Sequence, residues 1–411
     1  MAVLLIGTLD TKGVEFAHIR DRLTAAGVPV LVADAGSIGP PAFAPDISAA
    51  ELFALGKTPP SGDRNASVTA AAKGAAALAR KLFAEGRLTG IFGMGGSAGT
   101  VIGAAAMRAV PLGIPKVMVS TLASGDVRPY VGTRDIAMFH SVVDIAGLNR
   151  ISRMILDNAA AAMIGMLHHS ALRTPHSELP CVAASMFGVT TPCVQAARGH
   201  LEAAGCEVVT FHATGTGGRT MEELIAEGQF DGVLDLTTTE LADGLVGGVM
   251  AAGPDRLTAA ALRGTPQVIS VGALDMVNFG ARETVPAKFA GRRFHEHTAT
   301  VTLMRTTPEE NDRLGLEIAQ KACAAKGATA ILIPLRGISA LDIEGGPFRW
   351  PEANAALFQS LRNWVAGVEL IELDLHINDP EFARAAAETL RRLMESSRLL
   401  HAAANGGAVA Y

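Results

Sequence analysis

Short apolar runs alternate with longer amphipathic stretches through most of this 411-residue chain. The first run, residues 3–6, precedes a stretch in which Phe16, Ile19 and Leu23 recur at helical spacing until Gly27. Alternation of this kind is typical of βαβ units, whose strands form parallel sheets. It therefore predicts an α/β protein with mainly parallel sheets. Further strands are expected at residues 28–33, 91–92, 116–120, 182–186, 208–211, 232–236, 268–271, 330–333 and 370–373.

The strand–helix pattern starts twice, which predicts two domains. The polar residues 168–177 have the composition of a linker, and a chain of this length is sufficient for two cores. We therefore predict domains at residues 1–175 and 178–411. Residues 36–62 are expected to form a long Pro- and Gly-rich loop, and residues 298–305 an edge or antiparallel strand. Helices are expected at residues 13–26, 66–85, 151–167, 191–204, 221–227 and 380–394.

The charge of the chain argues against two classes of partner. Its formal net charge of -5 and its pI near 6.1 provide no basic surface for nucleic acid or acidic membranes. Residues 88–107 are uncharged over the length of a membrane span, but they contain six glycines and are followed by Arg108. No basic segment precedes the first apolar run, and the four cysteines form no CxxC pair. We therefore expect a cytoplasmic protein with no nucleic-acid or membrane partner.

A glycine-rich segment joins the expected third strand to a helix at residues 98–110. Glycines accept positive φ, so they allow successive backbone N–H groups to point into one concavity that holds an anion. The start of the helix adds its unpaired N–H groups and the positive end of its dipole. A tight turn with glycines needed only for packing is the alternative. The candidate anion-binding residues here are Gly93, Gly95, Gly96, Ser97, Gly99 and Thr100.

A second candidate loop follows the first strand, again directly before a helix. If the sheet has a flavodoxin-like order, the first and third strands are neighbours and both loops face one crevice at their carboxyl ends. Lys12 then supplies a charge for phosphate, Thr8 and Thr11 supply hydroxyls, and Asp10 is suited to Mg²⁺ or a ribose hydroxyl. The end of the fourth strand adds further hydroxyls nearby, from Ser120, Thr121 and Ser124.

Neither common nucleotide fingerprint is present. A P-loop requires Gly-x4-Gly-Lys-Ser/Thr, whereas Lys12 precedes Gly13 here. The dinucleotide motif requires Gly-x-Gly-x-x-Gly after the first strand, and the second glycine is missing. Asp34, at the end of the second strand, has the position of a ribose-binding acid in an NAD site, although a loop or helix-capping role is the alternative.

The second half contains the candidates for chemistry. His295 and His297 lie two residues apart, so they share a face if the chain is extended, which suits acid–base or metal-binding chemistry. Asp275 follows an expected strand, and His376 follows another apolar run. We take His295, His297 and Asp275 as catalytic candidates, with ordinary polar or loop roles as the alternative. No Gly-x-Ser-x-Gly elbow surrounds Ser339, so serine hydrolysis is not expected.

Five segments together resemble an uncharacterised bacterial and plant family. That family includes the ATP-binding amino-terminal region of the tomato mosaic virus resistance protein. The resemblance extends over nearly the whole chain, and it implies two Rossmann-like three-layer domains with a cleft between them, ATP binding and a homodimer. The segments are GTLDTKG at residues 7–13, GMGGSAGT at 93–100, VGTRDI at 131–136, GALDMVNFG at 272–280 and VTLMRT at 301–306.

Three functional hypotheses follow. The first is an ATP- or nucleotide-binding enzyme of small-molecule metabolism, with phosphates in the first domain, Mg²⁺ as a possible companion and a small-molecule substrate between the domains. The second is a nucleotide-sensing module that acts through a protein partner without turnover. The third is an NAD-dependent oxidoreductase, for which the fingerprint is missing. The sequence does not identify a metal site made of protein side chains.

Overall fold

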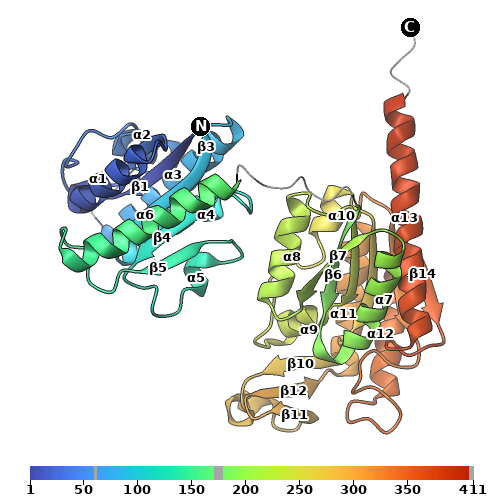
Figure 1. Ribbon diagram of the computed structural model, residues 1–411. Coiled ribbons are helices and arrows are strands. Elements are labelled where there is room, and N and C mark those ends of the chain that lie inside the picture. Colours follow the sequence, from blue (N-terminus) through green and yellow to red (C-terminus); the bar gives the residue numbers. More distant parts are fainter. Residues whose placement is uncertain (60–62, 171–178, 407–411) are drawn as a thin grey trace. The chain divides into compact units, whose positions relative to one another are not determined.

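The computed structural model describes residues 1–59, 63–170 and 179–406, and the chain divides into two compact units, Met1–Pro175 and His176–Tyr411 (Figure 1). Each unit is built around its own parallel sheet. The expected α/β class with parallel sheets is therefore confirmed.

The first unit contains a five-stranded sheet in the order β2-β1-β3-β4-β5, all of whose pairs are parallel. Its strands are β1 (Ala2–Gly7), β2 (Val30–Asp34), β3 (Leu88–Gly95), β4 (Lys116–Ser120) and β5 (Ala137–His140). Its helices are α1 (Leu9–Ala25), α2 (Ala49–Leu55), α3 (Arg64–Ala84), α4 (Ser97–Arg108), α5 (Arg128–Val131) and α6 (Arg150–Ser170).

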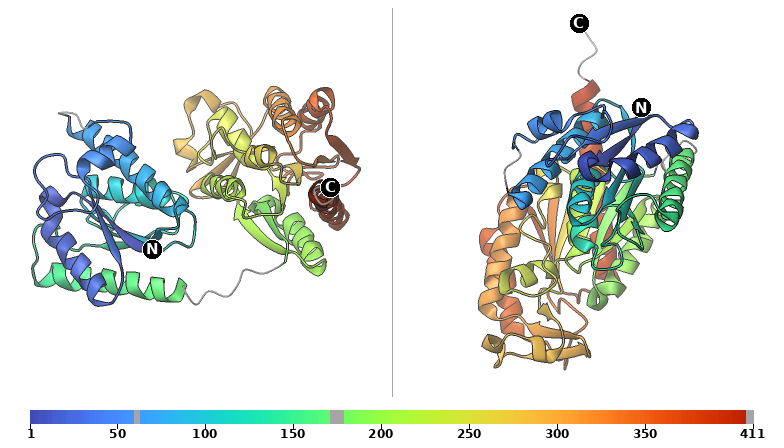
Figure 2. Two further views of the ribbon diagram at one scale, coloured as in Figure 1. Left: turned by 90° about the horizontal axis from the view of Figure 1, so that it is seen from above. Right: turned by 90° about the vertical axis from the view of Figure 1, so that its left-hand side faces the viewer.

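Helices cover both faces of this sheet (Figures 1 and 2). Alternate residues of β1 point to opposite faces, as the pleat of a strand requires. Val3 and Leu5 pack in a cluster with residues of α1 and α6, whereas Leu4 and Ile6 pack with residues of α2, α3 and α4. The unit is therefore a three-layer sandwich.

The second unit contains a six-stranded parallel sheet in the order β14-β13-β9-β8-β6-β7. Its strands are β6 (Cys181–Met186), β7 (Glu207–His212), β8 (Gly232–Thr237), β9 (Gln267–Gly272), β13 (Thr329–Pro334) and β14 (Glu369–Leu373). Its helices are α7 (Thr191–Ala203), α8 (Thr216–Ala226), α9 (Thr239–Val246), α10 (Ala259–Arg263), α11 (Pro308–Cys323), α12 (Pro351–Trp364) and α13 (Pro380–Gly406). Three short 3-10 turns complete it, η1 (Gly188–Thr190), η2 (Arg282–Thr284) and η3 (Ala287–Phe289).

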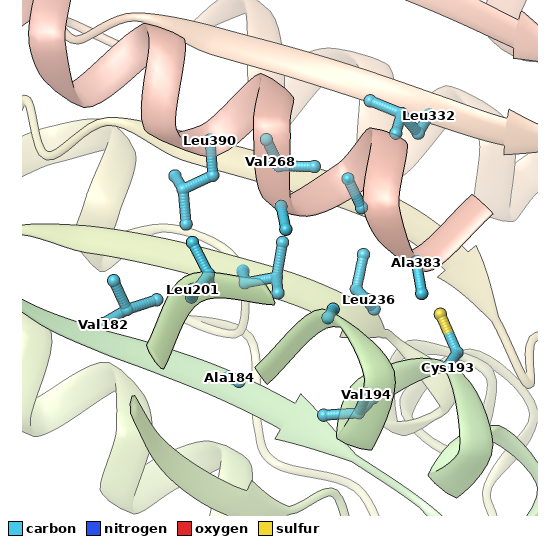
Figure 3. Packing of buried hydrophobic residues seen from close by; sticks show 14 of the residues in the cluster. Val182, Ala184, Cys193, Val194, Leu201, Leu236, Val268, Leu332, Ala383 and Leu390 are labelled. Atoms are coloured by element: carbon cyan, nitrogen blue, oxygen red, sulfur yellow. The ribbon is translucent and has the colours of Figure 1, made fainter. Parts of the chain in front are cut away.

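This second sheet is also covered on both faces. Figure 3 shows Val182 and Ala184 of β6 on the side of α7 and α13, where Leu201 and Leu390 complete one apolar cluster. Residues of α9, α11 and α12 pack on the opposite face of β9 and β13. Helices α8 and α10 cover the same opposite face beside β6 and β8.

A small antiparallel sheet in the order β10-β12-β11 is added to the second unit. Its strands are β10 (Met276–Phe279), β11 (Phe294–Thr298) and β12 (Val301–Arg305). The strand expected at residues 298–305 corresponds mainly to β12 and is antiparallel, which was one of the two possibilities given by the sequence. The sequence did not predict its partners β10 and β11.

Two sequence expectations need correction. The loop expected at residues 36–62 contains helix α2, whose seven residues begin at a Ser48–Glu51 capping box. Residues 168–170 of the expected linker are helical, because α6 continues to Ser170, and residues 171–177 of it lie outside the described part of the chain. Within the described ranges, no helix combines the length and the apolar character needed to cross a membrane.

A buried carboxyl group makes the stability of the second unit depend on pH. Asp243 of α9 is fully buried, and its carboxyl accepts hydrogen bonds from the backbone N–H groups of Asn278 and Met250, both at 3.1 Å, and from the Asn278 side-chain amide at 2.7 Å. Burial outweighs these bonds and raises the pKa of Asp243 to about 7.

We predict that Asp243→Asn reduces the pH dependence of stability. A carboxyl whose pKa is raised on folding contributes stability below its unfolded pKa of about 4, and that contribution is lost as pH rises through 7. The free energy of unfolding of the wild type should therefore fall relative to the variant by about 1.4 kcal/mol per pH unit in this window. Urea unfolding of both proteins at pH 5 and pH 8 tests this. Parallel curves for the two proteins would contradict it.

Candidate functional site

The two predicted loops meet at one pocket in the first unit. Strand β1 pairs in parallel with β3, so the loops that follow these strands lie at the same edge of the sheet. A pocket of about 610 Å³ opens there. The predicted residues that line it are Thr8, Asp10, Thr11, Lys12, Gly95, Gly96, Ser97 and Gly99.

The amino-terminal end of helix α4 forms one wall of this pocket. Gly96 precedes the helix, and no side chain caps its first N–H groups. Gly96, Ser97, Ala98 and Gly99 all line the pocket. The first N–H groups of a helix have no partner within the helix and carry the positive end of its dipole. This wall is therefore suited to an anion.

The glycines in this segment act mainly through close packing. Of Gly93, Gly95, Gly96 and Gly99, Gly95 alone has a positive φ, 155°, so the freedom to adopt such angles is used at one position. A Cβ atom on Gly99 would lie 2.6 Å from the backbone oxygen of Met94. On Gly93 it would lie 2.9 Å from the sulfur of Met118. On Gly96, by contrast, its nearest neighbour would be the Thr121 hydroxyl at 3.7 Å.

Two cationic side chains line the pocket. Lys12 lies at a break in α1, where its φ and ψ of -128° and 17° are not helical, and its ammonium group donates to the backbone oxygen of Ile145. Arg64, the first residue of α3, is exposed and also lines the pocket. Arg64 was not predicted from the sequence, because nothing in its local pattern distinguishes it from other helical arginines.

Two carboxylates also line the pocket. Asp10 Oδ2 accepts hydrogen bonds from the N–H groups of Ile38 at 2.9 Å and Gly39 at 3.3 Å, so it holds the loop after β2. Asp10 Oδ1 is buried and has no hydrogen-bond partner among the described residues. Asp144, also missed from the sequence, is exposed at the rim. The described residues contain no group of three His, Cys, Asp or Glu side chains placed to hold a metal.

The remaining predicted anion-binding residues lie outside the pocket lining. Thr100 and Ser120 are fully buried, and their hydroxyls are 2.7 Å apart, so they fasten α4 to β4. The backbone N–H of Thr121 donates to the oxygen of Gly95 at 3.3 Å. Gly93 lies within β3, and Ser124 is exposed in the loop after β4. These residues support the wall of the pocket or lie beside it.

Asp34 has the capping role that the sequence offered as its alternative. It is only 3% exposed. Its Oδ1 accepts hydrogen bonds from the N–H of Leu9, at the start of α1, at 3.0 Å and from the N–H of Gly36 at 2.8 Å. Its position outside the pocket lining weakens the case for a ribose contact of the NAD type.

The three catalytic candidates of the second unit lie in different environments. Asp275 is fully buried, accepts a 2.7 Å hydrogen bond from Ser339 and has a pKa raised to about 6 by burial. His295 is half-buried on β11 against the ring of Phe348, and His297 is exposed on the same strand. No hydrogen bond or ion pair between any two of these candidates occurs in the described structure.

His376 holds two loops together. Its Nδ1 accepts from the N–H of Asn378 at 3.1 Å, so its Nε2 donates to the backbone oxygen of Ser339 at 3.0 Å. Both ring nitrogens are therefore engaged by the backbone.

The chain matches two adjoining family models. Residues 1–171 match the one described as "Uncharacterised protein family (UPF0261) N-terminal domain", and residues 179–394 match the corresponding C-terminal domain. A UPF0261 protein of Clostridium tetani is 49% identical over 96% of this chain and 99% of its own length. One of Rhizobium meliloti is 48% identical over 95% of this chain and 98% of its own. These matches confirm the family resemblance seen in the sequence.

A plant protein is also similar. The ToMV resistance protein Tm-1 of Solanum lycopersicum is 45% identical over 76% of this chain, which corresponds to 43% of the plant protein. Among solved structures, UDP-N-acetylglucosamine 2-epimerase from Rickettsia bellii aligns over 96% of both chains, with 10% identity and a TM-score of 0.23. That TM-score is too low to support an inference about function.

We predict that Gly99→Ser destabilises the protein whereas Gly96→Ser does not. The added Cβ at Gly99 meets a backbone oxygen at 2.6 Å, and such overpacking costs about 1–3 kcal/mol. The one at Gly96 meets ordinary contact distances, and serine there is a favourable helix cap. Chemical denaturation of both variants measures the difference. An equal loss of stability in both variants would show that the close contact between α4 and β3 does not determine which residues are tolerated at these positions.

Proposed function

The chain belongs to the uncharacterised protein family UPF0261, and we propose that its first domain binds the phosphates of a nucleotide. The observation that carries this proposal is the convergence of the uncapped amino-terminal end of α4 with Lys12 and Arg64 on one pocket. Helix N–H groups and cationic side chains are the usual ligands of phosphate oxygens. We propose ATP as the nucleotide, because the family that the sequence resembles includes an ATP-binding region.

Mg²⁺ is the metal that we propose to accompany the nucleotide. Two carboxylates, Asp10 and Asp144, line the pocket beside the two cations, and Asp10 Oδ1 accepts no hydrogen bond from the described residues. Mg²⁺ is commonly held by one or two carboxylates together with the phosphates of its nucleotide and several waters. A pocket with this donor set suits a metal that arrives with the ligand.

We propose that the protein is a cytoplasmic, homodimeric enzyme that uses the nucleotide to convert a small molecule. A second candidate is a nucleotide-sensing module that acts through a protein partner. The binding-module hypothesis is favoured because the predicted catalytic residues of the second unit do not share one environment. Asp275 is buried and hydrogen-bonded to Ser339, whereas His297 is exposed on β11. Steady-state release of ADP or phosphate would decide for the enzyme.

We expect Lys12→Ala to weaken binding of Mg·ATP by about 10- to 100-fold, because a charge-assisted hydrogen bond contributes about 1.5–3 kcal/mol. Isothermal titration calorimetry measures this. The matched control is Lys73→Ala, which removes an exposed lysine of α3 outside the pocket lining and should leave the affinity unchanged. Absence of ATP binding by the wild type, or equal binding by Lys12→Ala, would refute the proposal.

Thermal unfolding separates ATP from NAD as the ligand. A ligand that binds only the folded state raises the melting temperature, and at a concentration 100 times its Kd it adds about 2.7 kcal/mol. We expect Mg·ATP to raise the melting temperature and NAD to leave it unchanged, since Asp34 is engaged by backbone N–H groups. A shift with NAD alone would favour the oxidoreductase hypothesis.

A further inference from the structure

A second pocket adjoins the phosphate pocket. It has a volume of about 520 Å³ and opens between the loop after β2 and helix α2. Ser37 lines both pockets, so one ligand that extends across this residue can have a part in each pocket. Asp10, a lining residue of the first pocket, fixes the loop between them through the N–H groups of Ile38 and Gly39.

Most of the wall of the second pocket is apolar, with Ser37, Lys57 and Thr58 as the polar lining residues, and α2 shapes it. Ala50 and Ala54 lie one helical turn apart on α2, and Phe53 lies beside them. Gly56 ends the helix against α3, where a Cβ would lie 2.7 Å from the backbone nitrogen of Gly74. The chain turns at the next residue, Lys57, whose φ is 51°, and Thr58 and Pro59 then line the pocket.

We propose that this second pocket binds the base of the nucleotide whose phosphates occupy the first, an inference that rests on the proposed function. Small apolar side chains suit the faces of a flat heterocycle and offer nothing to a phosphate. The pocket lies at the carboxyl end of β2, beside Gly36. In open α/β sheets, a ligand binds in the crevice outside the carboxyl ends of the strands. Ser37, which is exposed and lines both pockets, places a hydroxyl where the ribose of such a nucleotide would pass.

The test fills the base pocket and leaves the phosphate pocket unchanged. Ala54→Trp adds a large side chain at an exposed position of α2 that lines only the second pocket. Ala50→Trp is a second variant of the same kind. The matched control is Ala84→Trp, at an exposed position near the end of α3 outside both linings. Each protein is titrated by calorimetry with Mg·ATP and with inorganic tripolyphosphate, and circular dichroism verifies folding.

We expect the wild type to bind ATP more tightly than tripolyphosphate. Ala54→Trp should weaken ATP at least about tenfold and leave tripolyphosphate unchanged, because base contacts of this kind contribute about one order of magnitude or more. Equal affinity of the wild type for both ligands, or an equal loss of both in Ala54→Trp, would overturn the base pocket while leaving the phosphate site in place. A wild type that binds neither ligand would overturn the proposed function itself.

Discussion

Helix α4 lies so close to strand β3 that no side chain fits between them, and the pocket of the first domain depends on this approach. A Cβ on Gly99 would lie 2.6 Å from the oxygen of Met94, and one on Gly95 would lie 2.8 Å from the Cα of Gly99. A larger residue at either position must displace the start of the helix. Thr100 and Ser120 then hold that start against β4 through their hydroxyls. The N–H groups at the first turn of α4 are consequently fixed at the edge of the sheet, where the loop after β1 reaches them.

The two domains share one sheet order but use it differently. In each, the first strand lies between the second and the third, so the carboxyl ends of the first and third strands meet. In the first domain this edge carries the pocket. In the second domain buried polar groups bond to one another there, with the hydroxyls of Thr190 and Thr237 at 2.7 Å and Ser185 donating to Asp235. Asp235 in turn pairs with the buried Arg256. The same topology therefore produces an accessible pocket in one domain and a polar core in the other.

Apolar runs predicted every parallel strand except β5, because most of these strands are buried on both faces and appear as continuous apolar runs. Strand β5 was missed, and its four residues are half-buried or exposed. Apolar periodicity did not predict helix α2, whose seven residues lie within a Pro- and Gly-rich stretch, or the partners β10 and β11. Strand β10 is only four residues long, although it is buried throughout, and β11 is half-buried or exposed. Site residues were predicted where they follow a strand directly, as Lys12 does. Arg64 was missed because it begins a helix and does not follow a strand, and Asp144 was missed because β5, which it follows, was not predicted. The partners of Asp34 depend on how the loop after β2 folds back, which no local pattern encodes.

The proposed phosphate site differs from a P-loop in how its donors are distributed along the sequence. A P-loop carries its glycines, its helix start and its lysine in one segment. Here the glycines and the helix start follow β3, whereas Lys12 follows β1, more than 80 residues earlier in the sequence. The two loops meet only because β1 and β3 are neighbours in the sheet. The order of the strands in the sheet therefore brings together donors that are distant in the sequence. A search for one continuous motif cannot find such a site, because its donors come from two separate loops.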